Sequence, residues 1–187
     1  MRFGFTSDQL ALAAGVHAVL TEHCPSSVLR STADGKLGPA GQLWHRLADL
    51  GLLGALLPEE DGGLELNELD VLLGLEESGR FAVPVPLVET AVVAARLLAG
   101  PEHQERRVAL ARGTLRVTAV LDGSALVPWA GFATAMLIGD ESRVVLMPSV
   151  QTGPSASVDA SRPVSAVTAG PGVLIDPAIV LRPGGRA

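Results

Sequence analysis

The spacing of apolar residues changes near Gly113, and this change limits the folds that the chain can adopt. Before residue 113, apolar side chains recur every three or four positions, which predicts amphipathic helices. After it, short apolar runs alternate with Gly, Pro, Ser and Asp, a pattern typical of strands. We therefore predict an α+β fold, with an N-terminal α-helical bundle over residues 1–112 and a small, shortened β-sheet or barrel domain over residues 113–187.

The first helix is marked by a capping box, in which Thr6 is the N-cap and Gln9 stands three residues later. The helix should end before Pro25, because a proline disfavours helical geometry in the residue before it. We expect residues 26–38, rich in Ser, Gly and Asp, to form a loop before a helix that starts near Pro39. The predicted apolar face of the first helix comprises Leu10, Ala13, Ala14, His17 and Leu20.

Two later helices carry a strong apolar signal. Asn67 can cap the first of them, and Gly79 fits its C-terminal stop. The second covers residues 87–98, where Glu89 and Arg96 are the only charges. One small domain can hardly cover so apolar a helix, so we expect it to lie at an oligomer interface. The apolar positions of the helix after Asn67 include Leu69, Leu72 and Leu73.

Four apolar runs in the second half predict strands at residues 115–121, 135–138, 144–147 and 173–180. The intervening residues 149–160 have few bulky side chains, so we expect a loop there. The last residues, 182–187, should form a flexible tail.

The bulk composition excludes several classes of function. The net charge is −6 and no long basic stripe occurs, which argues against a nucleic-acid partner. Aromatic residues make up only 3% of the chain, so a platform for stacked bases is not expected. The uncharged stretch at residues 125–139 is too short for a membrane span. One cysteine, Cys24, and an N-terminus without a signal-peptide pattern predict a cytoplasmic protein.

Two polar clusters could be reactive sites. Residues 59–61, Glu-Glu-Asp, could form a metal site or an acid–base pair, but carboxylates before Gly-Gly are more typical of a solvated turn. His23 and Cys24 could form a metal or nucleophilic site, but the other histidines show no ligand spacing. We therefore predict no metal site.

Four segments resemble the N-terminal domain of the acyl-CoA dehydrogenase family, in the family's order. They are residues 5–9, Phe-Thr-Ser-Asp-Gln; residues 44–63, which contain Leu-Gly-Leu-Leu-Gly and Pro-Glu-Glu-Asp-Gly-Gly; residues 76–86, with Glu-Glu-Ser-Gly-Arg and two prolines; and residues 107–113. Together they extend over roughly the first 115 residues. The resemblance implies a helical bundle followed by a β-rich domain.

The chain also departs from the pattern that it resembles. The family's flavin-facing segment, of the type Thr-Glu-Pro-x-x-Gly-Ser-Asp, is missing, because Thr118 is followed by Ala119 and Val120. The sequence stops at Ala187, so we expect the C-terminal helical bundle, which usually carries the family's catalytic glutamate, to be absent. The resemblance therefore implies no catalytic residue in this chain.

The implied function is that of a subunit in a heteromeric flavoenzyme, which oxidises an acyl-CoA or acyl-carrier thioester to the α,β-unsaturated product. A homologous acyl-CoA dehydrogenase subunit would supply the base and would bind, or share, the FAD. The chain resembles the degenerate subunit of actinobacterial heteromeric enzymes of this family, which points to lipid, steroid or polyketide metabolism. Two alternatives stay open, a non-enzymatic scaffold or binding module with this fold and a fragment of a longer dehydrogenase.

Three residues are the candidates for contact with FAD, namely Thr118, Trp129 and Arg116. Trp129 could equally be a core aromatic or contact a partner chain. The basic cluster within residues 106–116 could bind CoA phosphates or the FAD pyrophosphate. Two glutamates on the same predicted helix favour surface pairing for this cluster.

Overall fold

The computed structural model describes residues 4–124, 126–140, 142–148, 153–167 and 170–176. Helices α1 to α6 lie at Ser7–His23, Ser26–Ala33, Gly38–Asp49, Glu68–Arg80, Ala95–Leu97 and Gln104–Ala111. A π-helical segment, η3, precedes α5, and three 3-10 turns complete the helical half; η1 to η4 lie at Leu52–Gly54, Glu59–Asp61, Glu89–Ala94 and Pro101–His103. None of the described helices is long and apolar enough to cross a membrane.

The strands of the described residues form two small sheets. Strands β1 to β7 lie at Val117–Val120, Leu126–Pro128, Ala135–Gly139, Val144–Pro148, Pro154–Ser155, Val164–Ala166 and Val173–Ile175. One sheet has the order β1-β3-β4-β7, with β1 parallel to β3 and the other pairs antiparallel. The other sheet is antiparallel, with the order β2-β6-β5. Helices followed by a small mixed sheet confirm the predicted α+β class, whereas the division into two domains at residue 113 stays a prediction.

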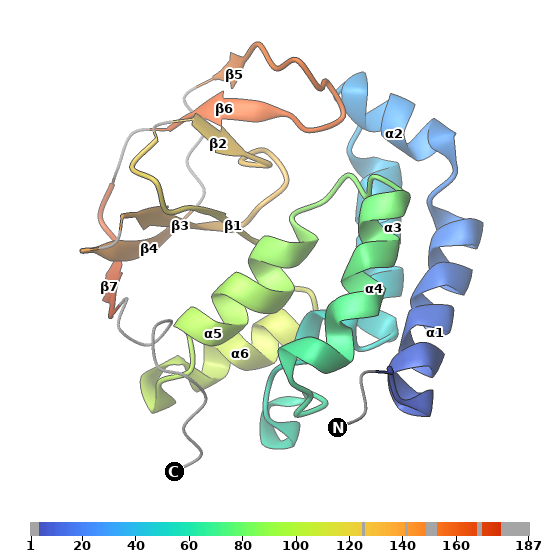
Figure 1. The fold of residues 1–187 in the computed structure, drawn as a ribbon. Helices are drawn as coiled ribbons and strands as arrows, with labels where there is room; N and C mark the ends of the chain where they lie inside the picture. The colour runs from blue at the N-terminus through green and yellow to red at the C-terminus, as the bar shows by residue number, and fades with distance from the viewer. Residues whose placement is uncertain (1–3, 125, 141, 149–152, 168–169, 177–187) are drawn as a thin grey trace.

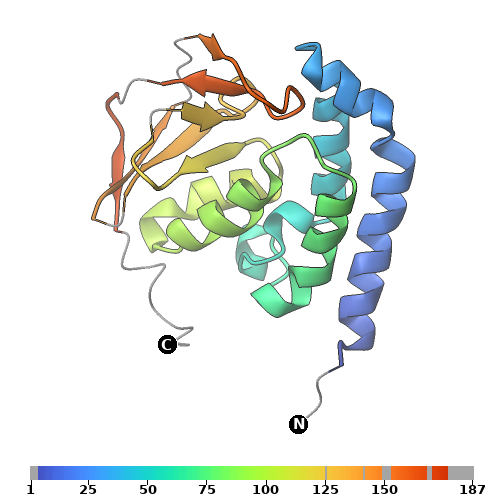
Figure 2. The same ribbon diagram turned by 45° about the horizontal axis from the view of Figure 1, so that its top comes forward.

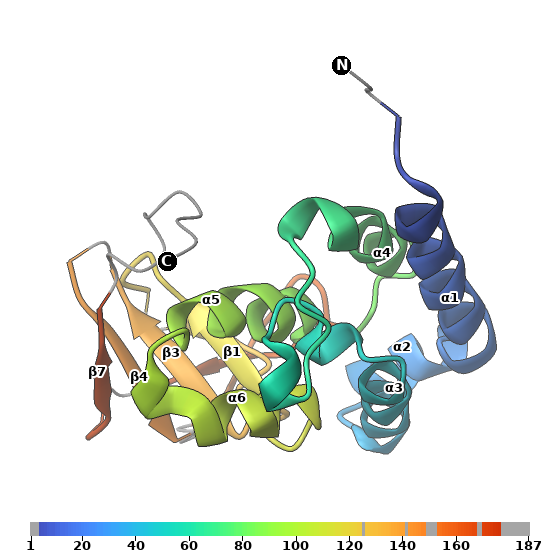
Figure 3. The same cartoon turned by 90° about the horizontal axis from the view of Figure 1, so that it is seen from below.

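The elements are arranged in layers around a shared core. Helices α5 and α6 lie between the four-stranded sheet and the bundle of α1 to α4 (Figures 1 and 3). One cluster of buried residues contains Leu98 and Leu110 from the helices and Leu137 and Leu146 from the strands. The three-stranded sheet covers the other face of the four-stranded sheet, where Met136 belongs to a second buried cluster (Figure 2). The chain thus buries apolar surface on both faces of its central sheet.

The capping box at Thr6 is confirmed, but the predicted apolar face of the first helix is largely wrong. The Thr6 hydroxyl accepts a hydrogen bond from the Gln9 amide, and the Gln9 side chain accepts one from the Thr6 amide. Leu10, by contrast, is 54% exposed, while Val16 and Leu20 are buried. This helix carries apolar residues around most of its circumference, so periodicity alone did not identify the buried face.

The expected loop at residues 26–38 is also wrong, because α2 occupies most of it. Pro25 stops α1 as predicted, but it also stands at the N-cap of α2 with φ of −64°. Val28 and Thr32, four residues apart, are buried and form the inner side of this helix. The third helix, α3, then begins with a proline at its first turn, as predicted.

In α4 the start was predicted correctly, and the apolar face was not. Asn67 caps the helix by accepting hydrogen bonds from the backbone amides of Leu69 and Asp70. Leu69 itself is 66% exposed and Leu72 46% exposed, whereas Val71 is buried. The predicted stop at residue 79 is wrong by one residue, since the helix ends at residue 80.

The apolar helix over residues 87–98 is covered by the chain itself. Ala91 and Ala94 are at most 3% exposed, and the Thr90 hydroxyl is hydrogen-bonded to both backbone groups of Val117 in β1. The sheet therefore packs on this helix, and the expectation of an oligomer interface here, which rested on its exposure, is wrong. Val88 remains exposed near the start of the helix.

The predicted strands at residues 115–121, 135–138 and 144–147 are present as β1, β3 and β4. Residues 173–175 form β7, and the remainder of the run at 173–180 lies largely outside the described residues, as does the predicted tail. The expected loop at 149–160 contains the two-residue strand β5, and β2 and β6 were not predicted. These three strands are too short to carry an alternating pattern.

The helical half and the sheet are joined at Gly113. The Trp44 indole N–H donates to the Gly113 carbonyl at 2.8 Å, and Gly113 has φ of +69°. A Cβ atom at this position would lie 3.0 Å from the indole nitrogen, so the joint favours glycine on two grounds. The Trp44 ring also meets the Phe132 ring edge-on at 5.8 Å. These contacts tie α3 to the first turn of the β half.

A buried ion pair fixes the acidic turn that precedes α4. Arg107 Nε donates to Asp61 Oδ2 at 2.6 Å, and both side chains are almost fully buried. The same guanidinium donates through Nη1 to the carbonyls of Leu98 and Gly100. The prediction of a solvated turn is therefore wrong for Asp61, and that of a surface role is wrong for Arg107. The other two carboxylates of the turn are exposed.

Replacing Asp61 with alanine should lower the free energy of unfolding by about 3–5 kcal/mol, because it leaves the Arg107 charge buried without its carboxylate. Urea unfolding followed by circular dichroism measures the change. The matched control is Glu60→Ala, an exposed neighbour in the same turn, which should stay within about 0.5 kcal/mol of the parent. Equal effects of the two substitutions would show that the pair does not hold the turn.

Candidate functional site

A cleft of about 490 Å³ opens between the helical half and the segment that leads into β6. Its helical side is formed by the C-terminal end of α4, the connecting residues 82–87 and the first turn of η3. Its other side is formed by Trp129 and by residues 159–162. The segment between β5 and β6 reaches across to the helical half at this place (Figure 1). The cleft is thus built from segments far apart in the sequence.

The segment between α4 and η3 supplies apolar side chains to the helical wall of the cleft. The Pro-rich residues 82–87 cannot continue α4, because proline lacks an amide donor and restricts the residue before it. Val88 is 46% exposed and presents apolar surface to the cleft, while the lining residues Val85 and Leu87 are at most 4% exposed and fixed by packing. A wall of this kind suits the hydrocarbon part of a ligand.

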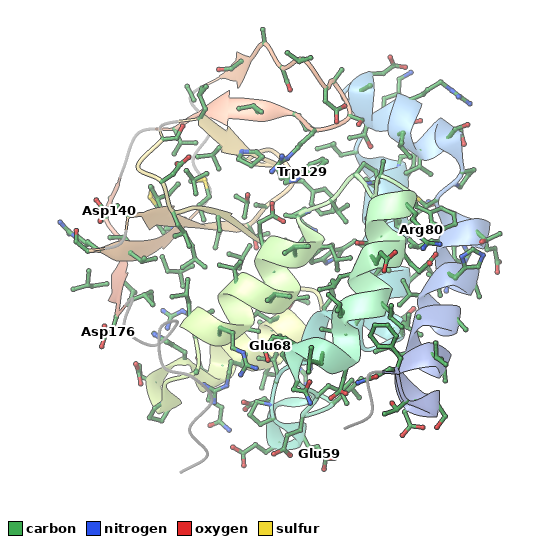
Figure 4. All side chains as sticks on the ribbon, in the orientation of Figure 1. Glu59, Glu68, Arg80, Trp129, Asp140 and Asp176 are labelled. Carbon is green, nitrogen blue, oxygen red and sulfur yellow. The ribbon has the colours of Figure 1, made fainter. Side chains whose placement is uncertain are left out.

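Trp129 faces this wall from the end of β2 (Figure 4). Its backbone has φ of +61°, an uncommon conformation for a residue other than glycine. The Trp129 amide donates to the Pro163 carbonyl, and its carbonyl accepts from the amides of Phe132 and Ala133. These bonds hold the strained turn, and Trp129 as a whole is only 5% exposed. The indole therefore lines the cleft in a fixed position.

One charged pair lies in the cleft. Arg162 Nη2 is 3.8 Å from Glu89 Oε1, and the Glu89 side chain is 18% exposed while that of Arg162 is 56% exposed. Burial raises the pKa of the Glu89 carboxyl above its usual value, against the opposing effects of its backbone hydrogen bond and of Arg162. Asp159 and Ser161 also line this end of the cleft. The cleft therefore combines an apolar wall with a polar end.

Of the three predicted cofactor contacts, Trp129 lines the cleft, whereas Thr118 and Arg116 are not among its lining residues. The Thr118 hydroxyl is fully buried and donates to the Pro128 carbonyl at 2.7 Å. Arg116 Nε donates to the Phe132 carbonyl at 2.7 Å, with the guanidinium 4.7 Å from the centre of that ring. A role of the three in FAD binding stays a prediction.

Sequence reasoning missed Glu89 and Arg162. A lone carboxylate in an otherwise apolar helix was a signal for Glu89, since such a charge needs water or a partner. No local pattern pointed to Arg162, which reaches the cleft only because β6 pairs with β2. The acidic turn at residues 59–61 does not take part, and Glu59 lies at the opposite end of the helical half from Trp129 (Figure 4). Within the described residues, no group of three or more His, Cys, Asp and Glu could hold a metal ion.

Comparison with known proteins identifies the helical half. Residues 6–113 match the family model described as "Acyl-CoA dehydrogenase, N-terminal domain". The chain is 26% identical over 156 residues to acyl-CoA dehydrogenase IpdE2 of Mycolicibacterium smegmatis. That match covers 83% of this chain and 50% of the relative, so the chain spans about half the length of this relative.

Solved structures share the fold at low sequence identity. A variant of the Tcur3481-Tcur3483 steroid acyl-CoA dehydrogenase matches with a TM-score of 0.73 at 21% identity, over 91% of this chain and 57% of that one. The ChsE4-ChsE5 complex from Mycobacterium tuberculosis matches with a TM-score of 0.68 at 23% sequence identity. This match covers 89% of this chain and 59% of that one. An acyl-CoA dehydrogenase complexed with FAD from Bacillus anthracis matches with a TM-score of 0.62 at 15% sequence identity. This match covers 91% of this chain and 37% of that one. These matches show the fold, and FAD occurs within the family.

Replacing Glu89 with glutamine should raise the urea midpoint near neutral pH. A carboxyl whose pKa is raised by folding contributes stability below its unfolded pKa and loses it as pH rises through the folded value. The gain from glutamine should therefore shrink as pH falls toward the usual carboxyl pKa. Urea titrations at about pH 7.5 and about pH 4.5 measure this difference. The control is the exposed Glu105→Gln, and a pH-independent gain at residue 89 would contradict the expectation.

Proposed function

This chain belongs to the acyl-CoA dehydrogenase family, and from this premise we propose that it is a subunit of a heteromeric flavoenzyme that oxidises an acyl-CoA or acyl-carrier thioester to its α,β-unsaturated product. A homologous acyl-CoA dehydrogenase subunit supplies the catalytic base. The observation that carries the proposal is the match of residues 6–113 to the N-terminal domain of the family, together with the cleft on the same part of the fold. The structural relatives named as two-component assemblies support a partner subunit.

The cleft supports a role for this chain in holding the acyl group. Val88 offers exposed apolar surface to the cleft, and the buried lining residues Val85, Leu87 and Trp129 are already fixed in place before a ligand binds. A preformed wall loses little side-chain freedom on binding, so the contact of a hydrocarbon group with it is favourable. The partner would close the remaining side of the cleft.

Two of the three candidate groups for flavin contact already have partners within the described part of the chain. The Thr118 hydroxyl and the Arg116 Nε–H, which could have donated to a flavin ring, are both used on backbone carbonyls of this chain. A flavin needs donors free to face its ring nitrogens and carbonyls. This supports an FAD that is bound mainly by the partner and shared, at most, through Trp129.

Co-expression with a homologous acyl-CoA dehydrogenase encoded beside this chain tests the proposal. The two chains should elute together from a sizing column and carry a flavin absorbance near about 450 nm. A colourless complex would favour the alternative of a scaffold with this fold. A monodisperse monomer that ignores the partner would contradict a heteromeric enzyme.

A substitution at Glu89, a carboxylate that lines the cleft, tests whether this chain supplies the catalytic base. The nearby Arg162 guanidinium stabilises the ionised carboxylate, and we assign Glu89 to binding instead of proton abstraction. Glu89→Gln should therefore lower kcat of the flavin-loaded complex far less than the about 10²- to 10⁴-fold cost of removing a general base. Steady-state kinetics with an artificial electron acceptor measures this. A loss within that range would place the base in this chain and overturn the proposal.

A further inference from the structure

The polar end of the cleft holds a donor and an acceptor that are not saturated. The 3.8 Å between Arg162 Nη2 and Glu89 Oε1 is longer than a direct hydrogen bond. The Glu89 carboxylate accepts one backbone hydrogen bond, which leaves further lone pairs on its two oxygens, and its contact with Arg162 is an ion pair. A charged pair at this spacing leaves room for an oxygen atom about 2.9 Å from each partner.

The fold holds the two groups in place by different means. Glu89 stands at the start of η3, the π-helical segment that packs on β1. The Arg162 amide donates to the Asp159 carbonyl, and the Asp159 carboxylate accepts from the backbone and hydroxyl of Ser161. The turn that carries Arg162 is thus braced by its own hydrogen bonds. The guanidinium at its tip remains more than half exposed.

The chemistry of this pair selects one class of ligand group. A neutral hydroxyl can donate its proton to the Glu89 carboxylate and accept a hydrogen bond from the Arg162 guanidinium at the same time. A carboxylate on the ligand would be repelled by Glu89 and by Asp159 at the same end of the cleft. A pure hydrocarbon would leave both charged groups without partners when water is displaced.

We propose that the Glu89–Arg162 pair is a specificity site for a hydroxyl group, so that the cleft takes an apolar acyl group that carries a neutral hydroxyl away from its thioester. The inference rests on the proposed function, because it assigns the cleft to the acyl group. It adds a statement about the substrate class. Val88 and the edge of Trp129 contact the carbon skeleton, and the pair contacts the oxygen.

The test is a fragment titration of the full chain, alone or in its co-purified complex, followed by ¹H–¹⁵N spectra. Cyclohexanol and cyclohexanethiol have nearly the same shape, but a thiol is a weak hydrogen-bonding group. The Trp129 indole N–H reports on the cleft. The buried Trp44 indole, bonded to Gly113, is the internal reference. Cyclohexanol should shift the Trp129 signal and bind about three- to tenfold more tightly than the thiol.

Variants of the pair should remove this preference. Arg162→Met keeps much of the side-chain length without the donor, and should lower the cyclohexanol affinity to that of the thiol. Glu105→Gln is the matched control and should leave both affinities unchanged. Equal binding of the two probes, no shift of Trp129 with either, or a preference that survives Arg162→Met would each overturn the proposal. None of these results would alter co-elution with the partner or the flavin absorbance, so the two proposals can fail separately.

Discussion

The buried ion pair between Asp61 and Arg107 joins three parts of the helical half that are distant in sequence. Through Nη1, the same guanidinium donates to the carbonyls of Leu98 and Gly100, which follow the C-terminal end of α5. That helix continues η3, which packs on β1, so the position of the central sheet depends on the pair. A buried charge tolerates few arrangements, because each donor must be satisfied without water. Packing alone would leave more freedom in the angle between helices and sheet.

The cleft follows from this placement. Its helical wall is the chain immediately before η3, and its opposite wall is the turn after β2, which the sheet carries. The joint at Gly113, where the indole of Trp44 is bonded, fixes the same two halves from the other side. With both connections made within one chain, the distance between the walls is set before any partner binds. This agrees with a subunit that presents part of a binding surface and leaves the reacting groups to another chain.

Sequence reasoning recovered the features that depend on local chemistry and missed those that depend on tertiary packing. The capping box at Thr6 and the N-cap at Asn67 were predictable, because their hydrogen bonds join residues two or three positions apart. The fold class followed from the change in apolar spacing. The buried faces of α1 and α4 could not be read in the same way, since their leucines are distributed around the helix. The contact between Glu89 and Arg162 depends on strand pairing between β2 and β6, and neither strand had a recognisable pattern.

The π-helical turns of η3 have a consequence for how related clefts can diverge. A π-helix closes its hydrogen bonds over one residue more than an α-helix does. Deleting a single residue within η3 would restore α-helical hydrogen bonding. The residues before the deletion would then be rotated by about 100° about the helix axis, relative to the buried alanines that follow it. Glu89 would then leave the cleft although its codon was untouched. A one-residue length change at this helix is therefore a route to a different ligand preference that needs no substitution in the wall itself.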